Sequence, residues 1–129
     1  MVKKILKKIL IIDEDVFTQV CSAILGLEGY KIETHKTCGG KSKTSNLKNF
    51  GLIVTSYPYC IPVLRELKEI DIPKIILFDN LNIEMITFLK NFTQSFCMVK
   101  PIDFSEFRSL VKEILIDNNA EYFHGVNII

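Results

Sequence analysis

The feature that most constrains the fold is an unbroken aliphatic run, residues 9–12, that leads directly into the acids Asp13, Glu14 and Asp15. A continuous apolar run suits a strand covered on both faces, as in a parallel sheet, better than a half-exposed strand. The acids then fall at the carboxyl end of that strand, which is the edge where open α/β sheets bind ligands. Three neighbouring carboxylates repel one another unless a metal cation or a lysine neutralises their charge. A functional site is therefore expected at this edge.

The rest of the chain alternates strand-like apolar segments with segments of helical periodicity. Further strands are expected at residues 30–34, 50–56, 73–78 and 95–99. Helices are expected at residues 16–27, 61–70, 83–92 and 103–115, with at most a short one at 45–49 inside a loop. The apolar face of the first helix is expected to comprise Val16, Phe17, Val20, Ile24 and Leu27. Strict alternation of strand and helix implies a parallel sheet with helices on both faces.

Acidic residues mark three of the expected helix starts. Asp15 is expected to cap the helix that begins at residue 16, because a short carboxylate accepts hydrogen bonds from the first free backbone amides. Asp103, with Glu106 three residues on, forms the pattern of a capping box before the last helix. Asp79 follows the strand at 73–78 and is expected to cap the next helix, with metal binding as the alternative.

The length and charge of the chain limit the class of protein. Its 129 residues fit one domain. Residues 1–118 are expected to form that domain, and residues 119–129, which have no periodicity, to be a flexible end or the start of a linker. The net charge of +1 gives no reason to expect nucleic acid or a membrane surface as a partner. The apolar run behind the N-terminal lysines is too short for a signal peptide or a membrane span, so a cytoplasmic location is expected.

The cysteines and histidines do not follow the spacing of a metal site. The four cysteines are Cys21, Cys38, Cys60 and Cys97. They are expected to be small buried apolar residues, with a reactive thiol at Cys60, in an expected loop, as the alternative. His35 and His124 stand alone in polar surroundings and are expected at the surface.

Residues 39–42, Gly-Gly-Lys-Ser, resemble the end of a phosphate-binding P-loop. That motif requires a glycine five residues before its second glycine, and His35 stands at that position. The segment also follows the second expected strand without a strong helix behind it. A solvated loop is therefore the expected structure of this segment.

The order of these features resembles the receiver domains of bacterial two-component response regulators over roughly residues 7–117. The resemblance rests on Ile-Ile-Asp-Glu at residues 11–14, the third strand at 50–56, and Val-Lys-Pro at residues 99–101 followed by a capped helix. It implies a doubly wound, flavodoxin-like α/β fold. In that fold five parallel strands lie in the order 2-1-3-4-5, with helices on both faces.

In the receiver family, an acidic pair after strand one holds Mg²⁺, and an aspartate that ends strand three accepts a phosphoryl group from a histidine kinase. A Thr or Ser that ends strand four and a lysine after strand five contact the phosphate. Asp13 and Glu14 match the acidic pair, and Lys100 matches the lysine. By the same resemblance, the peptide bond between Lys100 and Pro101 is expected to be cis.

Two positions depart from the family pattern. The position of the phosphoryl acceptor falls on Ser56, whose hydroxyl forms no acyl phosphate and supplies no anionic ligand to Mg²⁺. The switch position at the end of strand four falls on Phe78, which cannot form a hydrogen bond with a phosphate. The resemblance thus points to a degenerate phosphorylation site.

The charged residues that remain at this site have three alternative roles. The first is an ion pair of Lys100 with Asp13 or Glu14 that locks the edge of the sheet. The second is weak binding of Mg²⁺ at Asp13 and Glu14, and no other cofactor is expected. The third is phosphoryl transfer to a displaced acceptor such as Ser56 or Thr55.

We expect a pseudo-receiver that is not an enzyme and acts as a phosphorylation-independent protein–protein interaction module in two-component-type signalling. The alternative is a phosphorylatable receiver that uses Mg²⁺ and a displaced acceptor to regulate an effector domain. An unrelated nucleotide binder is disfavoured, because the acids after strand one repel phosphate.

The expected partner is a kinase, an effector domain or a second copy of the chain. The surface expected to bind it combines the helix at 83–92, the strand at 95–99 and the helix at 103–115. This surface is rich in aromatic residues: Phe88, Phe92, Phe96, Phe104 and Phe107. One or two of these, if exposed, would mark a homodimer or partner patch.

Overall fold

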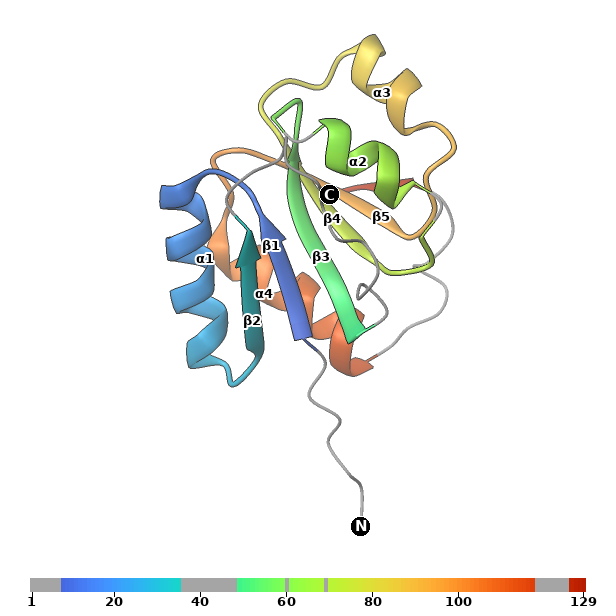
Figure 1. Ribbon diagram of the computed structural model, residues 1–129. Helices are drawn as coiled ribbons and strands as arrows, with labels where there is room; N and C mark the ends of the chain where they lie inside the picture. Colours follow the sequence, from blue (N-terminus) through green and yellow to red (C-terminus); the bar gives the residue numbers. More distant parts are fainter. Residues whose placement is uncertain (1–7, 36–48, 60, 69, 118–125) are drawn as a thin grey trace.

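The computed structural model describes residues 8–35, 49–59, 61–68, 70–117 and 126–129. The core of the molecule is one parallel sheet of six strands in the order β2-β1-β3-β4-β5-β6 (Figure 1). The strands are β1 (Lys8–Ile12), β2 (Lys31–His35), β3 (Phe50–Tyr57), β4 (Lys74–Phe78), β5 (Ser95–Val99) and β6 (Val126–Ile128). The doubly wound order expected for the first five strands is confirmed, and a sixth strand extends it.

Among the described residues, four helices cover the two faces of the sheet: α1 (Asp15–Leu27), α2 (Ile61–Leu67), α3 (Ile83–Leu89) and α4 (Phe104–Lys112). A π-helical turn, Glu113–Asp117, continues α4. Helices α1 and α4 pack on one face, and α2 and α3 pack on the other (Figure 1). Strands β1, β3 and β4 are buried between these layers, as their unbroken apolar runs predict. No helix in the described part of the chain is both long and apolar enough to span a bilayer.

The side of α1 that faces the sheet differs from the predicted one. Val16, Val20 and Leu27 were expected to be buried, but they are 74%, 41% and 90% exposed. Cys21 and Leu25 are fully buried in their place. The helix carries apolar residues around more than half of its circumference, while the sheet covers only one stripe of it. Periodicity therefore predicts that a helix forms here but does not settle which stripe packs inward.

Two of the three predicted helix caps are wrong. Asp15 is the first residue of α1, and Glu14 precedes it as N-cap without a side-chain hydrogen bond to the helix. Asp79 is exposed and lies before the loop that leads to α3. The cap of α3 is Asn82, whose side chain accepts a hydrogen bond of 2.8 Å from the backbone amide of Met85. The short side chain of asparagine suits this position as well as that of aspartate.

The predicted N-cap of the last helix, the Asp103 half of the capping box, is confirmed. The Asp103 carboxylate accepts hydrogen bonds from the backbone amides of Ser105, at 2.8 Å, and Glu106, at 3.2 Å. This cap fixes the point at which the chain leaves β5 and turns back along the sheet as α4.

Part of the segment expected to be a flexible end or linker is strand β6. Residues 126–128 pair in parallel with residues 95–97 of β5, and the Asn127 side-chain amide donates to the backbone oxygen of Ser95 at 3.3 Å. Strand β5, helix α4 and strand β6 thus form one more βαβ unit. The expected domain boundary at residue 118 lies outside the described residues, as do Cys38, Cys60, His124 and residues 39–42. His35 is exposed, as expected.

Lys74, at the start of β4, is completely buried although it is charged in water. Its ammonium group donates to three backbone oxygens, those of Ile70 at 2.7 Å, Ile72 at 2.8 Å and Thr93 at 3.3 Å. These bonds tie the loops before β4 and β5 together. Burial lowers the pKa of Lys74 to about 8, against a smaller opposing effect of Asp71.

This lowered pKa predicts how stability depends on pH. From about pH 8 upward the folded chain releases the Lys74 proton while the unfolded chain keeps it, so the free energy of unfolding rises with pH. We expect this residue to contribute a rise of about 1–3 kcal/mol between pH 7.5 and 10, measured by urea unfolding. The buried thiols have the opposite effect, because they make the free energy of unfolding fall as the pH rises. The contribution of Lys74 is therefore the rise in the free energy of unfolding of the wild type minus the rise measured for Lys74→Met. The control is Lys31→Met, which removes an exposed lysine of β2.

The two cysteines within the described residues, Cys21 and Cys97, are buried, as predicted. Burial raises the pKa of Cys21 to about 12, and burial raises that of Cys97 to about 11. A thiol of this kind supplies almost no thiolate at neutral pH, and the thiolate is the nucleophile.

We therefore expect both thiols to resist a thiol-specific disulfide reagent at pH 8 in the folded protein. The measurement uses a variant in which Cys38 and Cys60 are serine, so that only the two buried thiols report. Both should react within minutes in urea. Fast labelling of either thiol in native buffer would contradict its buried position.

Candidate functional site

The predicted site residues lie at the carboxyl ends of β1, β3 and β5. These ends share one edge of the sheet, with β4 between β3 and β5 (Figure 1). Asp13 directly follows β1, Ser56 lies near the end of β3, and Lys100 directly follows β5. The register of β1 and β3 pairs Ile12 with Thr55, so the next residue of each strand, Asp13 and Ser56, are also neighbours. Parallel strands bring such residues to one edge because all their carboxyl ends point the same way.

The Asp13 carboxylate is the centre of the site and is fully buried. Its Oδ1 atom accepts a hydrogen bond of 2.8 Å from the Ser56 hydroxyl and one of 2.7 Å from the Glu14 backbone amide. Its Oδ2 atom lies 3.7 Å from the Lys100 ammonium, outside hydrogen-bonding distance, and has no hydrogen-bond partner among the described residues. A buried carboxylate keeps its charge only when hydrogen bonds and a countercharge replace water.

Lys100 is held over the site from two sides. Its backbone amide donates to the backbone oxygen of Phe78 at 2.7 Å, and its ammonium lies 5.1 Å from the centre of the Phe17 ring. That distance is within the range of a cation–π interaction. The bond between Lys100 and Pro101 is cis, the geometry expected from the resemblance, and a second cis bond joins Tyr57 to Pro58. The lysine side chain is 23% exposed, so its ammonium group pairs with Asp13 while remaining partly in contact with solvent.

Of the two acids that could pair with Lys100, the structure places Asp13 beside it. Glu14 is exposed and contributes its backbone amide to the site rather than its carboxylate. Asp79 is exposed as well, and no ion pair joins it to the site among the described residues. Among the side chains that the structure describes here, Asp13 is the one buried carboxylate.

The two positions predicted to depart from the family pattern carry buried side chains. Ser56 is 1% exposed, and its hydroxyl points to Asp13. Phe78 pairs with Tyr57 across β3 and β4 and packs into the core cluster under α3. Thr55, the other candidate acceptor, is fully buried, and its hydroxyl has no hydrogen-bond partner among the described residues. Neither hydroxyl is open to an incoming phosphoryl group.

These residues do not fit a two-carboxylate Mg²⁺ site. Mg²⁺ prefers an octahedral shell of oxygen ligands, with carboxylates among them. One oxygen of Asp13 is already engaged in two hydrogen bonds, the other faces the Lys100 cation, and Glu14 is turned outward. Within the part of the chain that the structure describes, no three His, Cys, Asp or Glu side chains gather as metal ligands.

Sequence reasoning missed two residues of α1 that border the site, Phe17 and Cys21. Phe17 lies under the Lys100 ammonium. The Cys21 thiol is fully buried, and its pKa is raised by burial and, to a smaller extent, by the Asp13 charge, while the Lys100 charge lowers it. Their spacing in the sequence could have identified them as neighbours of the site. Residues 17 and 21 lie four and eight positions after Asp13, and they share one face of the helix.

The expected partner surface is changed by β6 and by the burial of its aromatic residues. Strand β6 pairs with β5, which the expected five-strand order placed at the end of the sheet. None of the five phenylalanines is exposed, because Phe92, Phe96 and Phe107 are buried and the other two are partly buried. The exposed apolar side chains of this region are aliphatic instead: Leu81, Ile83, Ile86 and Val99.

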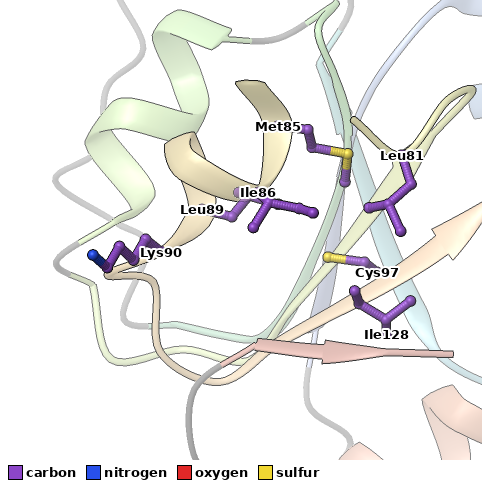
Figure 2. A pocket seen from close by; sticks show the side chains of 7 residues that line it. All are labelled: Leu81, Met85, Ile86, Leu89, Lys90, Cys97 and Ile128. Atoms are coloured by element: carbon purple, nitrogen blue, oxygen red, sulfur yellow. The ribbon is translucent and has the colours of Figure 1, made fainter. Parts of the chain in front are cut away.

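A small cavity of about 220 Å³ lies between α3 and the strands β5 and β6 (Figure 2). Its lining is Leu81, Met85, Ile86, Leu89, Lys90, Cys97 and Ile128. The lining is almost entirely apolar, and Figure 2 shows the Lys90 ammonium pointing away from Ile128. The cavity borders β5 and β6, whereas Asp13 follows β1, which β3 and β4 separate from β5.

No protein-family model and no curated protein matches the chain by sequence. Solved structures do match. A CheY-like response regulator receiver domain protein from Methanospirillum hungatei JF-1 is 23% identical, with a TM-score of 0.73 over 91% of this chain and 99% of that chain. A response regulator receiver domain protein from Clostridium thermocellum is 20% identical, with a TM-score of 0.72 over 90% of this chain and 99% of that chain.

A two-component response regulator from Clostridium difficile is also 20% identical, with a TM-score of 0.71 over 88% of this chain and 98% of that chain. At this level of identity the likeness concerns the fold. The parallel order of β2-β1-β3-β4-β5 and the helices on both faces agree with it. This chain therefore has the flavodoxin-like fold of response regulator receiver domains.

Proposed function

We propose that the chain is a pseudo-receiver: a cytoplasmic, non-catalytic module of two-component-type signalling that binds protein partners without being phosphorylated. The receiver fold of its structural neighbours supports the signalling role. One observation carries the rest of the proposal: the Ser56 hydroxyl occupies the expected acceptor position and donates its hydrogen bond to Asp13.

A phosphoryl transfer that forms an acyl phosphate needs a carboxylate as nucleophile and a cation that neutralises the charge of the transferring group. Position 56 offers a hydroxyl that is already used as a donor, and Asp13 and Lys100 neutralise each other. The side chains that would bind Mg²⁺ and phosphate in a working receiver therefore bind one another here and hold β1, β3 and β5 together. In this proposal Mg²⁺ is not a cofactor.

Without a phosphoryl switch, the module responds only to partners that bind one of its conformations better than another. The ion pair of Asp13 and Lys100 favours one arrangement of the edge because breaking it leaves a buried charge unpaired. In this proposal, partners thus bind a stable surface, and recognition does not depend on a conformational change driven by phosphorylation.

The first test is a titration with Mg²⁺ and beryllofluoride, which mimics an acyl phosphate and needs an aspartate to bind, followed by amide NMR shifts. For the wild type we expect no saturable shifts at Asp13, Glu14, Ser56 or Lys100. The matched variant is Ser56→Asp, which places a second carboxylate beside Asp13. We expect it to gain Mg²⁺-dependent beryllofluoride shifts, since two carboxylates bind Mg²⁺ and one accepts the mimic.

The alternative, a working receiver with a displaced acceptor, predicts the opposite result for the wild type. Saturable, Mg²⁺-dependent shifts that start at these residues and spread to α3 and α4 would overturn the pseudo-receiver. Mass spectrometry after incubation with acetyl phosphate checks the same point, because transfer to Ser56 or Thr55 would leave a stable phosphoester.

A second prediction concerns the ion pair. Lys100→Met keeps most of the packing on Phe17 but leaves the buried Asp13 charge without its partner, so we expect the free energy of unfolding at pH 7 to fall by about 1–3 kcal/mol. Combining it with Asp13→Asn should recover part of this loss, because no charge is then left unpaired. Urea unfolding measures both variants.

The control for the ion pair is Arg108→Met. Arg108 and Glu28 form a pair 3.9 Å apart in which both side chains are about half exposed. Exposed pairs contribute little to stability, so this variant should stay within about 0.5 kcal/mol of the wild type. Equal losses in the Lys100 and Arg108 variants would contradict a special role for the buried pair.

A further inference from the structure

The two edges of the sheet differ in how well they are protected against pairing with another chain. The outer strand β2 carries the charged residues Lys31 and Glu33 together with His35, all exposed, and His35 lies 3.5 Å from Glu33. Charged side chains on an edge strand are a common protection against edge-to-edge association. The outer strand β6, with Ile129 after it, has the sequence Val-Asn-Ile-Ile and carries no charged side chain. The β6 edge therefore lacks the protection that β2 has.

The hydrogen bonds of β6 show which backbone groups face outward. The Ile129 amide donates to the Cys97 oxygen of β5 at 2.9 Å. Successive residues of a strand direct their backbone groups to opposite sides, so the N–H and C=O of Ile128 point away from β5. Within the described residues the sheet ends at β6, and Ile128 presents a donor and an acceptor along this outer edge.

We propose that this edge pairs with the β6 edge of a second copy of the chain, antiparallel and centred on Ile128. An antiparallel pair of strands contains positions where two opposite residues exchange both N–H···O bonds. A two-fold axis through the two Ile128 residues makes them such a pair. The dimer then contains one continuous sheet of twelve strands, derived from two sheets of six.

The side chains around Ile128 suit this arrangement. Ile128 is 55% exposed and lines the cavity under α3 together with Leu81 and Ile86, which are 48% and 52% exposed (Figure 2). Residues directly opposite each other in an antiparallel pair place their side chains in contact on one face. The two Ile128 side chains therefore meet on the α3 face, next to the apolar residues of both cavities, and bury surface that the single copy leaves in water.

The properties of this edge favour a second copy over an unrelated partner. A two-fold interface brings each residue of a patch to the same patch of the other chain, which penalises charged patches and suits neutral ones. The outer strand here carries no charged side chain, so no like charges oppose its pairing with itself. The charged β2 edge stops further growth, so pairing ends at a dimer. The proposal goes beyond the function proposed above, because it requires nothing of Asp13 or Ser56.

The test is sedimentation velocity of the full chain from about 10 µM to about 1 mM, concentrations that cover weak association. We expect a concentration-dependent dimer. Ile128→Pro removes the outward N–H, at a position where an edge strand tolerates proline, and Ile128→Lys places two like charges across the axis. Each should raise the dimer Kd at least about tenfold. The control is Leu27→Lys on α1, which changes another exposed aliphatic residue and should leave Kd unchanged.

Hydrogen exchange gives a second readout that does not depend on the variants. The Ile128 amide should be protected at high protein concentration and exchange freely on dilution. Circular dichroism of each variant confirms that it is folded. A chain that stays monomeric at the highest concentration overturns the proposal, and the edge would then be open to an extended segment of another protein. A dimer that survives both Ile128 variants, or that Leu27→Lys abolishes, also overturns it.

Discussion

The carboxyl edge of the sheet depends on the contact between the buried Asp13 carboxylate and its partners. A full charge without water is stable only if neighbouring groups replace the lost hydration. The Ser56 hydroxyl and the Glu14 amide supply hydrogen bonds to one oxygen, and Lys100 supplies the countercharge near the other. Because these residues come from three strands or the turns after them, the contact fixes the spacing of β1, β3 and β5.

The same contact links the fold to the proposed function. In a receiver that is phosphorylated, this edge must stay open to a cation and to an incoming phosphoryl group. Here the polar groups satisfy one another, and Phe78 fills the space at the end of β4 as part of the core. Exposed apolar side chains remain at the periphery, on the outer side of α1 and in the region where α3 meets β6.

Much of the architecture could be predicted from local pattern. The unbroken apolar runs predicted three buried strands, and alternation with helical segments predicted a parallel sheet. The errors occurred where a local pattern permits more than one outcome. Apolar residues surround most of α1, so Val16, Val20 and Leu27 were placed on the wrong side. Asn82 and Asp79 are equally good caps by residue type, and only the path of the loop before α3 selects Asn82.

The sequence by itself predicted that Asp13, Ser56 and Lys100 lie at one edge of the sheet, because parallel strands end there. The resemblance to receiver domains added the prediction that they form one site. Only the tertiary structure decided that Asp13 rather than Glu14 pairs with Lys100, since adjacent residues leave the strand in different directions and one of them is exposed. The structure also decided the role of residues 126–128. Three residues are too few for a periodic signal, and they form a strand because the edge of β5 offers them hydrogen bonds.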